Sequence, residues 1–165
     1  LLLARGEDGG LPLTRDDVDL GAMIAGLGEL YAPAAERLDK QLVVAANAAG
    51  TVRADRELIE RAVATLLENG LVHTEGGAKI WIGIERRDGV AVVVVEDSGP
   101  GIAAPDRERI FDRFVRLDDA RNPEGAGLGL PIARMVARLH DGDLTVDVSP
   151  FGGAAFRLVL PVADG

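Results

Sequence analysis

The stretch VEDSGPGIAA, residues 95–104, ends a run of valines in two carboxylates and then breaks on two glycines and a proline. A surface turn explains such a stretch when it stands alone, because Asp, Ser, Gly and Pro are favoured in turns. A turn needs only one glycine, however, and here Gly99 and Gly101 both follow Asp97. A carboxylate at a strand end can accept a hydrogen bond from an exocyclic amine, and glycines let the backbone approach a planar ligand without a Cβ in the way. The stretch therefore raises the hypothesis of a ligand pocket.

The elements upstream of this stretch alternate between helical and strand patterns. Residues 78–87 and 90–97 form a predicted hairpin, with Asp88-Gly89 as its turn. Before it, Asp55 can cap a helix over 55–70. The apolar residues of that helix recur at helical spacing and predict a core-facing stripe: Ile59, Ala62, Val63, Leu66, Leu67 and Gly70.

The remaining segments complete a two-layer pattern. We expect a helix over 18–38 with one apolar face (Leu20, Ile24, Leu27 and Leu30), then short strands at 41–46 and 51–54 separated by the turn NAAG. Downstream, an irregular region over 103–124 with one short helix near 106–115 precedes a helix over 129–139 and a second hairpin, 143–149 with 151–161. This order predicts an α/β (α+β) two-layer sandwich. Its sheet would be mixed and mostly antiparallel, covered on one face by about three helices.

Length and composition limit the possible classes of function. At 165 residues the chain fits one domain, and the absence of cysteine excludes disulfides and thiolate-bound metals. The net charge of −9 argues against binding to a nucleic acid backbone, but not against a nucleotide in one local pocket. No apolar run has the length of a membrane span, and the start, LLLARGEDGG, lacks the layout of a signal peptide. We interpret residues 1–16 as a linker after the end of a longer upstream helix, and residues 17–165 as the domain.

Two further features point to a phosphate ligand. EGAGLGLPIARMVARL (124–139) places three glycines before a helix, where free N–H groups and the helix dipole favour an anion. A dinucleotide fingerprint would need a preceding strand in a βαβ unit, and here a long loop precedes the glycines. Asn69 lies at the edge of the apolar stripe, where its amide oxygen could bind magnesium, although a lone Asn near a helix end is usually a cap.

Four motifs taken together resemble a known family. Asn69, DSGPGI (97–102), IFDRF (110–114) and GAGLGL (125–130), in this order and spacing, are similar to the catalytic ATP-binding domain of sensor histidine kinases. These form one branch of the ATPase and kinase superfamily, with the Bergerat fold, that includes DNA gyrase B, Hsp90 and MutL. The resemblance runs over about residues 18–161 and implies that the chain binds ATP and Mg²⁺.

The resemblance implies roles for the residues around the adenine. Asp97 would bind the adenine amine, and Gly99, Gly101 and Ile102 would shape the adenine pocket. His73 stands where the family often has an aromatic residue near the nucleotide; the alternative is a surface histidine.

The resemblance also implies roles around the phosphates. Asn69 resembles the magnesium-coordinating Asn of the N box. The glycine box, which hinges a lid over residues 103–124 and meets the phosphates, is matched by Gly125, Gly127, Leu128, Gly129 and Leu130.

The lid itself carries two further matches. Phe111 and Phe114 resemble the phenylalanine box that anchors it. Arg116 matches an arginine that often faces the phosphates or the phosphoacceptor, and Arg113 is a weaker match; for both, the alternative is a solvated arginine. His140 matches a structural turn position.

Three positions depart from the family pattern. Thr65 stands where many histidine kinases have a second Asn, Val72 where they often have Lys or Arg, and Ala154 where Thr usually helps to hold adenine. The ATP-hydrolysing relatives carry a Glu base at the position of Thr65, and Thr65 cannot take a proton in that way. Transfer of phosphate to another nucleophile is therefore favoured over attack by water.

The nucleophile is expected outside this chain, because neither His73 nor His140 lies in the H-[ED]-x-x-x-P context of a phosphoacceptor. The resemblance implies a protein-histidine kinase whose partners are the histidine-containing dimerisation domain of the same kinase and a response regulator. The isolated domain would be a cytoplasmic monomer, and the full-length protein a homodimer anchored in the cell membrane. Two alternatives remain open: a serine kinase of the anti-sigma type, and a nucleotide-binding pseudokinase module without phosphotransfer.

Overall fold

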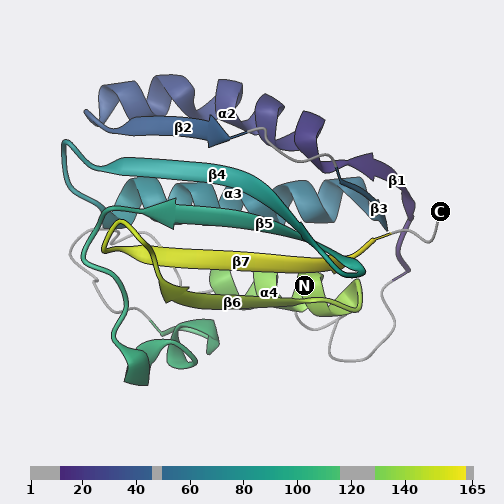
Figure 1. Cartoon of the computed structure of the whole chain (residues 1–165). Helices are drawn as coiled ribbons and strands as arrows, with labels where there is room; N and C mark the ends of the chain where they lie inside the picture. Colours follow the sequence, from purple (N-terminus) through teal and green to yellow (C-terminus); the bar gives the residue numbers. More distant parts are fainter. Residues whose placement is uncertain (1–11, 46–49, 116–128, 163–165) are drawn as a thin grey trace.

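Three α-helices cover one face of a five-stranded sheet in the part of the chain that the structure describes (Figure 1). This computed structural model describes residues 12–45, 50–115 and 129–162. The elements are, in order, β1 (Asp16–Asp19), α2 (Leu20–Arg37), β2 (Gln41–Ala45), β3 (Thr51–Ala54), α3 (Arg56–His73), β4 (Lys79–Arg87), β5 (Val90–Asp97), η1 (Ala104–Asp106), η2 (Arg109–Phe111), α4 (Gly129–Leu139), β6 (Asp143–Val148) and β7 (Ala154–Pro161). The predicted two-layer α/β sandwich is confirmed.

The five-stranded sheet has the order β2-β4-β5-β7-β6. β2 runs parallel to β4, and the other neighbouring pairs are antiparallel, so the predicted mixed sheet is correct. β3 pairs instead with β1, a strand that the sequence did not predict, in a separate two-stranded sheet. The second hairpin is shorter than predicted, because Ser149 N donates to Gly153 O and closes a turn before β7 begins at Ala154.

Helix α2 packs on β2 through a glycine. Asp19 caps the helix by accepting a hydrogen bond from Ala22 N at 3.1 Å. A Cβ at Gly28 would lie 2.3 Å from Val44 Cγ2, so this close approach requires glycine despite its low helix propensity. The prediction that Leu30 shares the buried face was wrong, because its side chain is 68% exposed. Ten residues at about 100° each turn Leu30 roughly 80° away from Leu20, and Tyr31 packs against the core instead.

Helix α3 carries the candidate magnesium ligand across the middle of the sheet. Asp55 caps it by accepting from Leu58 N at 3.3 Å, as predicted. Its C-terminal end reaches His73, three residues beyond the predicted end. Lys40 holds this end, because Lys40 Nζ donates to the carbonyls of Leu71 and Thr74. A cation at this position also complements the helix dipole.

His140 joins the end of α4 to the start of α3. Its ring accepts a hydrogen bond from Asp55 N at Nε2 (2.9 Å), so the proton is on Nδ1, which lies 2.7 Å from Val136 O. The side chain is 3% exposed and both ring nitrogens are engaged. This placement agrees with the structural role expected for His140.

The core lies between the helices and the sheet. Its largest fully buried side chains are Phe156, Leu20, Ile24, Ile59, Leu66, Leu67, Ile80, Ile82, Leu144, Leu158, Leu160 and Val18. No helix among the described residues is both long and apolar enough to cross a membrane.

Candidate functional site

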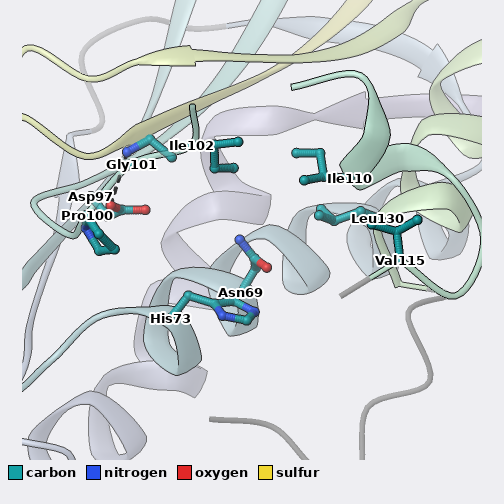
Figure 2. A pocket seen from close by; sticks show the side chains of 10 residues that line it. Asn69, His73, Asp97, Pro100, Gly101, Ile102, Ile110, Val115 and Leu130 are labelled. Carbon is teal, nitrogen blue, oxygen red and sulfur yellow. Dashed lines mark hydrogen bonds between the residues drawn. The ribbon is translucent and has the colours of Figure 1, made fainter. Parts of the chain in front are cut away.

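A cavity of about 270 Å³ opens beside the end of α3 and collects most of the described candidate residues. Its lining consists of Asn69, His73, Asp97, Pro100, Gly101, Ile102, Ile110, Val115, Leu130 and Ala154. In Figure 2, Asn69 and His73 rise from one helix, with Asp97 and Gly101 on one side and Ile110 and Leu130 on the other. Residues separated by more than sixty positions in the sequence therefore meet around one space.

Asp97 is fixed by the backbone at the end of β5. Its Oδ1 accepts hydrogen bonds from Gly99 N at 2.9 Å and from Ala154 N at 3.2 Å. The residue is 8% exposed, and a carboxylate oxygen points toward the cavity (Figure 2). Because two N–H groups hold one oxygen, the other is oriented to accept from a ligand amine.

Two of the neighbouring glycines are favoured for different reasons, Gly99 by close contacts and Gly101 by its backbone conformation. A Cβ at Gly99 would lie 2.8 Å from Thr74 Cγ2 and 3.0 Å from Asp97 Oδ1. Gly101 has φ +75°, a conformation that L side chains rarely adopt. Gly101 lines the cavity, whereas Gly99 supports it from behind through its bond to Asp97.

Asn69 and His73 lie four residues apart on α3, so both face the cavity. Both side chains are half-buried. The amide of Asn69 points into the space between the two walls (Figure 2). An amide oxygen there can act as a ligand of a hard cation such as magnesium.

The departures from the family pattern have distinct positions. Thr65 Oγ1 donates to Arg61 O at 3.0 Å, so its hydroxyl is engaged with its own helix. Ala154 lines the cavity and offers only its backbone N–H to Asp97. Val72 is half-buried and does not line the cavity.

Four described candidates of the lid and glycine box lie outside this lining. Phe111 is buried and contacts the guanidinium of Arg134, whose Cζ lies 4.6 Å from the ring centroid. Phe114 is 70% exposed with φ +66°, and Arg113 beside it is exposed. Gly129 begins α4, where an added Cβ would lie 3.2 Å from Thr65 Cγ2.

The predicted lid, 103–124, is described as far as Val115. The short helix expected near 106–115 was wrong, since two separate 3₁₀ turns, η1 and η2, occupy the segment. Arg116, Gly125, Gly127 and Leu128 lie outside the described residues.

Sequence reasoning missed apolar and glycine positions of the site. The cavity is also lined by Pro100, Ile110 and Val115. Ile110 belongs to the motif IFDRF, but no role was predicted for it from the sequence. Gly153 was missed although a Cβ there would lie 2.1 Å from Asp97 Oδ1. Its signal was the pair Gly152-Gly153 before a strand. No group of three or more His, Cys, Asp or Glu that could hold a metal occurs among the described residues.

Comparisons with known proteins identify the family of this chain. The family model described as histidine kinase-, DNA gyrase B- and HSP90-like ATPase matches residues 54–164. The sensor protein IrlS of Burkholderia pseudomallei is 39% identical over 163 residues, which is 98% of this chain and 35% of that protein. The sensor-like histidine kinase SenX3 of Mycobacterium tuberculosis is 35% identical over 147 residues, 88% of this chain and 36% of that protein. The chain thus spans about a third of the length of these curated relatives.

Solved structures show the same arrangement. Full-length ShkA in complex with AMPPNP superposes with a TM-score of 0.86 at 27% identity, covering 99% of this chain and 34% of that one. The mycobacterial sensor histidine kinase MprB superposes with a TM-score of 0.77 at 28% identity, covering 92% of this chain and 100% of that one. The chain belongs to the histidine kinase-, DNA gyrase B- and HSP90-like ATPase family, as an ATP-binding catalytic domain of the sensor histidine kinase type.

Proposed function

We propose that the cavity binds ATP with Mg²⁺ and that the domain transfers the γ-phosphate to a histidine in another domain of the same kinase. One observation carries the proposal: the buried carboxylate of Asp97 and the amide of Asn69 line the same cavity, from different elements. The first suits the adenine amine, and the second suits a metal bound to phosphates. The remaining lining between them is mainly apolar, as a planar base requires.

The adenine end of the site is supported by the geometry of Asp97. The Oδ1 atom is held by Gly99 N and Ala154 N, so the carboxylate can present its other oxygen to the base. Gly101 and Ile102 border the space where the ring would lie. Adenine presents an amine at this edge, whereas guanine presents a carbonyl oxygen, which a carboxylate would repel.

The phosphate end is supported by Asn69 and the start of α4. Magnesium prefers few protein ligands together with phosphate and water, so the Asn69 amide oxygen fits as its protein ligand. Bound there, the ion would neutralise charge on the phosphates. The N-terminus of α4 at Gly129, next to Leu130 in the lining, adds a favourable dipole. Roles for Arg113 and Arg116, and for Gly125, Gly127 and Leu128, stay predictions.

Transfer to a histidine is favoured over hydrolysis by the groups around the cavity. Among its described lining residues, Asp97 is the one carboxylate, and it lies at the adenine end. Thr65 cannot act as a general base, because a neutral hydroxyl is too weakly basic, and its proton is donated to Arg61 O. The buried ring of His140 is engaged in the fold and is no phosphoacceptor.

The rest of the kinase follows as part of this proposal. Residues 17–165 would form the catalytic domain, and 1–16 a linker with the end of the upstream dimerisation helix. The dimerisation domain and a response regulator would be its partners, in a membrane-anchored homodimer. The two functions that compete with a histidine kinase are a serine kinase of the anti-sigma type and a pseudokinase module without phosphotransfer.

Binding is tested by titration calorimetry with a non-hydrolysable ATP analogue and Mg²⁺. We expect saturable binding that Asp97→Asn weakens by on the order of 1–3 kcal/mol, because the new NH₂ group faces the adenine amine, donor against donor. Asp88→Asn is the matched control: this exposed residue lies in the β4–β5 turn, where Asn-Gly is as favourable as Asp-Gly. Equal affinity for ATP and GTP would contradict the adenine assignment.

A further inference from the structure

The side chain of Arg134 joins α4 to η2, and these two elements together supply one side of the nucleotide cavity. Its guanidinium donates from Nη1 to Glu108 Oε2 at 2.8 Å, and Glu108 directly precedes η2. The same guanidinium lies over the ring of Phe111 at the other end of η2, with Cζ 4.6 Å from the centroid. Ile110, between these two contacts, lines the cavity. The side chain of Arg134 therefore contacts η2 both before and after Ile110, the residue that lines the cavity.

The other end of this connection is anchored in the body of the domain. Arg134 Nε donates to Asp143 Oδ1 at 3.1 Å, at the start of β6. Asp143 Oδ1 also accepts from Leu144 N at 2.9 Å and from Arg138 Nε at 3.3 Å. The Arg134 side chain is 12% exposed and that of Asp143 is 41% exposed, so this contact is partly shielded from water. Leu130, one turn before Arg134 on α4, lies on the same side of the cavity as Ile110 (Figure 2).

The charges of this cluster are mutually stabilising. Burial by itself raises the pKa of Asp143, but hydrogen bonds from Arg134 and the Leu144 amide, with the charges of Arg134 and Arg138, outweigh it and lower that pKa. The hydrogen bond and charge of Arg134 likewise lower the pKa of the Glu108 carboxyl. Both carboxylates are therefore ionised at neutral pH, and the guanidinium is held between two anions.

We propose that Arg134 is a positioning residue for nucleotide binding, which holds η2 against α4 so that Ile110 and Leu130 stay together as one side of the cavity. This inference rests on the proposed function, since it assigns the cavity to ATP. Arg134 itself does not line the cavity, so it acts through η2 and not by touching the ligand.

Arginine suits this task better than lysine. A planar guanidinium can bond Glu108 and Asp143 with different nitrogens while its face covers Phe111, whereas an ammonium is a single point charge. Arg134→Lys should therefore recover only part of the function lost in Arg134→Met. Glu108→Gln removes the charge of this ion pair and keeps the contact of Arg134 with Phe111, and because Glu108 is on the surface this variant should fold normally.

The test combines two readouts on the whole chain. Hydrogen exchange without nucleotide follows the amides of Phe111 and Asp112, which donate to Glu108 O and Arg109 O within the held segment. Affinity for a non-hydrolysable ATP analogue with Mg²⁺ is measured by titration calorimetry. Arg138→Met is the matched control, since Arg138 shares Asp143 with Arg134 but makes no hydrogen bond or ion pair with η2 in the part of the chain that the structure describes.

We expect Arg134→Met to speed exchange at both amides by about tenfold and to weaken analogue binding by about fivefold, the scale of one ion pair with one cation–π contact. Glu108→Gln should shift both readouts in the same direction by less, and Arg138→Met should leave both near wild type. Unchanged exchange in Arg134→Met and Glu108→Gln, or equal losses in Arg138→Met, would overturn the proposal. If the wild-type chain binds no analogue, the proposed function fails, and exchange alone then decides whether Arg134 holds η2.

Discussion

Gly153 lies so close to Asp97 that a single added Cβ atom would disturb the proposed adenine site. A Cβ there would lie 2.1 Å from Asp97 Oδ1, 2.3 Å from Asp97 O and 2.7 Å from Gly99 N. Two of these three atoms are backbone, which cannot move aside as the end of a flexible side chain can. The backbone of residue 153 therefore lies directly against the carboxylate that the ligand would meet.

We predict that Gly153→Ala displaces Asp97 and weakens binding of an ATP analogue by at least about tenfold, while lowering the free energy of unfolding by about 1–3 kcal/mol, as for other overpacked sites. Gly26→Ala is the control, because a Cβ at this position in α2 meets nothing within 4 Å. That variant should stabilise the fold slightly through higher helix propensity and leave binding unchanged. Calorimetric titration and denaturant unfolding measure both effects; wild-type affinity in Gly153→Ala would refute the crowding argument.

The same residues show where sequence reasoning succeeds and where it stops. Asp97, Gly101 and Asn69 were predicted because each belongs to a motif with its own chemistry, and the cavity unites them. Gly153 was not predicted, because its need for glycine arises from contact with a residue 56 positions earlier (153 − 97), and the local pair Gly152-Gly153 does not show which atoms lie against it. Ile110 and Pro100 were missed for a similar reason, since an apolar residue gives no sign of whether it faces a core or a ligand.

At the scale of elements, local patterns predicted helices and hairpins well but not their partners. Asp88-Gly89 and Asp55 fixed the β4–β5 hairpin and the start of α3 because turn and cap chemistry is local. The pairing of β3 with β1, and of β2 with β4 in parallel, depends on contacts between distant segments. The prediction that Leu30 is buried was wrong for a geometric reason. On a helix with 3.6 residues per turn, a residue ten positions after Leu20 no longer points to the same face.

The lid is the element whose behaviour is most open to test. Its described part holds two 3₁₀ turns with few backbone bonds, whereas α3 is continuous over Arg56–His73. Ile110 and Phe111 are buried, but Arg113 and Phe114 are exposed. Because Arg134 bonds Glu108, we expect the part of the lid next to Glu108 to move less than Arg113 and Phe114.

We predict that, without nucleotide, amides of residues 103–115 exchange with deuterium faster than those in the middle of α3, because local opening costs least where backbone bonds are few. Within the segment, Phe111 and Asp112 should be the slowest to exchange, since both amides are bonded beside the contacts of Arg134. Saturating ATP analogue with Mg²⁺ should slow the whole segment, and the β4–β5 core is the internal reference. Equal protection of the segment and α3 in the free protein would contradict the lid interpretation.

At the scale of the whole molecule, the domain binds ATP, and Asp97 is the one carboxylate among the described residues that line the cavity. Thr65 stands where a hydrolytic base would be needed, and its hydroxyl is engaged with Arg61 O. Of the two histidines in the chain, His140 is buried in the fold and His73 lines the cavity. A domain of this kind is expected to work on a nucleophile supplied from outside.

We predict that the isolated domain hydrolyses ATP very slowly and does not label itself, but phosphorylates a histidine when mixed with the helical phosphoacceptor domain of its own kinase. The product should be labile in acid and stable in alkali, as followed with γ-labelled ATP.

Asn69→Ala should lower this transfer by at least about a hundredfold, because it removes the amide oxygen proposed to hold magnesium. It should leave the unfolding transition nearly unchanged, since Asn69 is only half-buried and no hydrogen bond of its side chain supports the described core. Glu68→Gln, an exposed change at the preceding residue of α3, is the control and should transfer at the wild-type rate. An acid-stable product on serine would favour the serine kinase function, and binding without any transfer would favour the pseudokinase module.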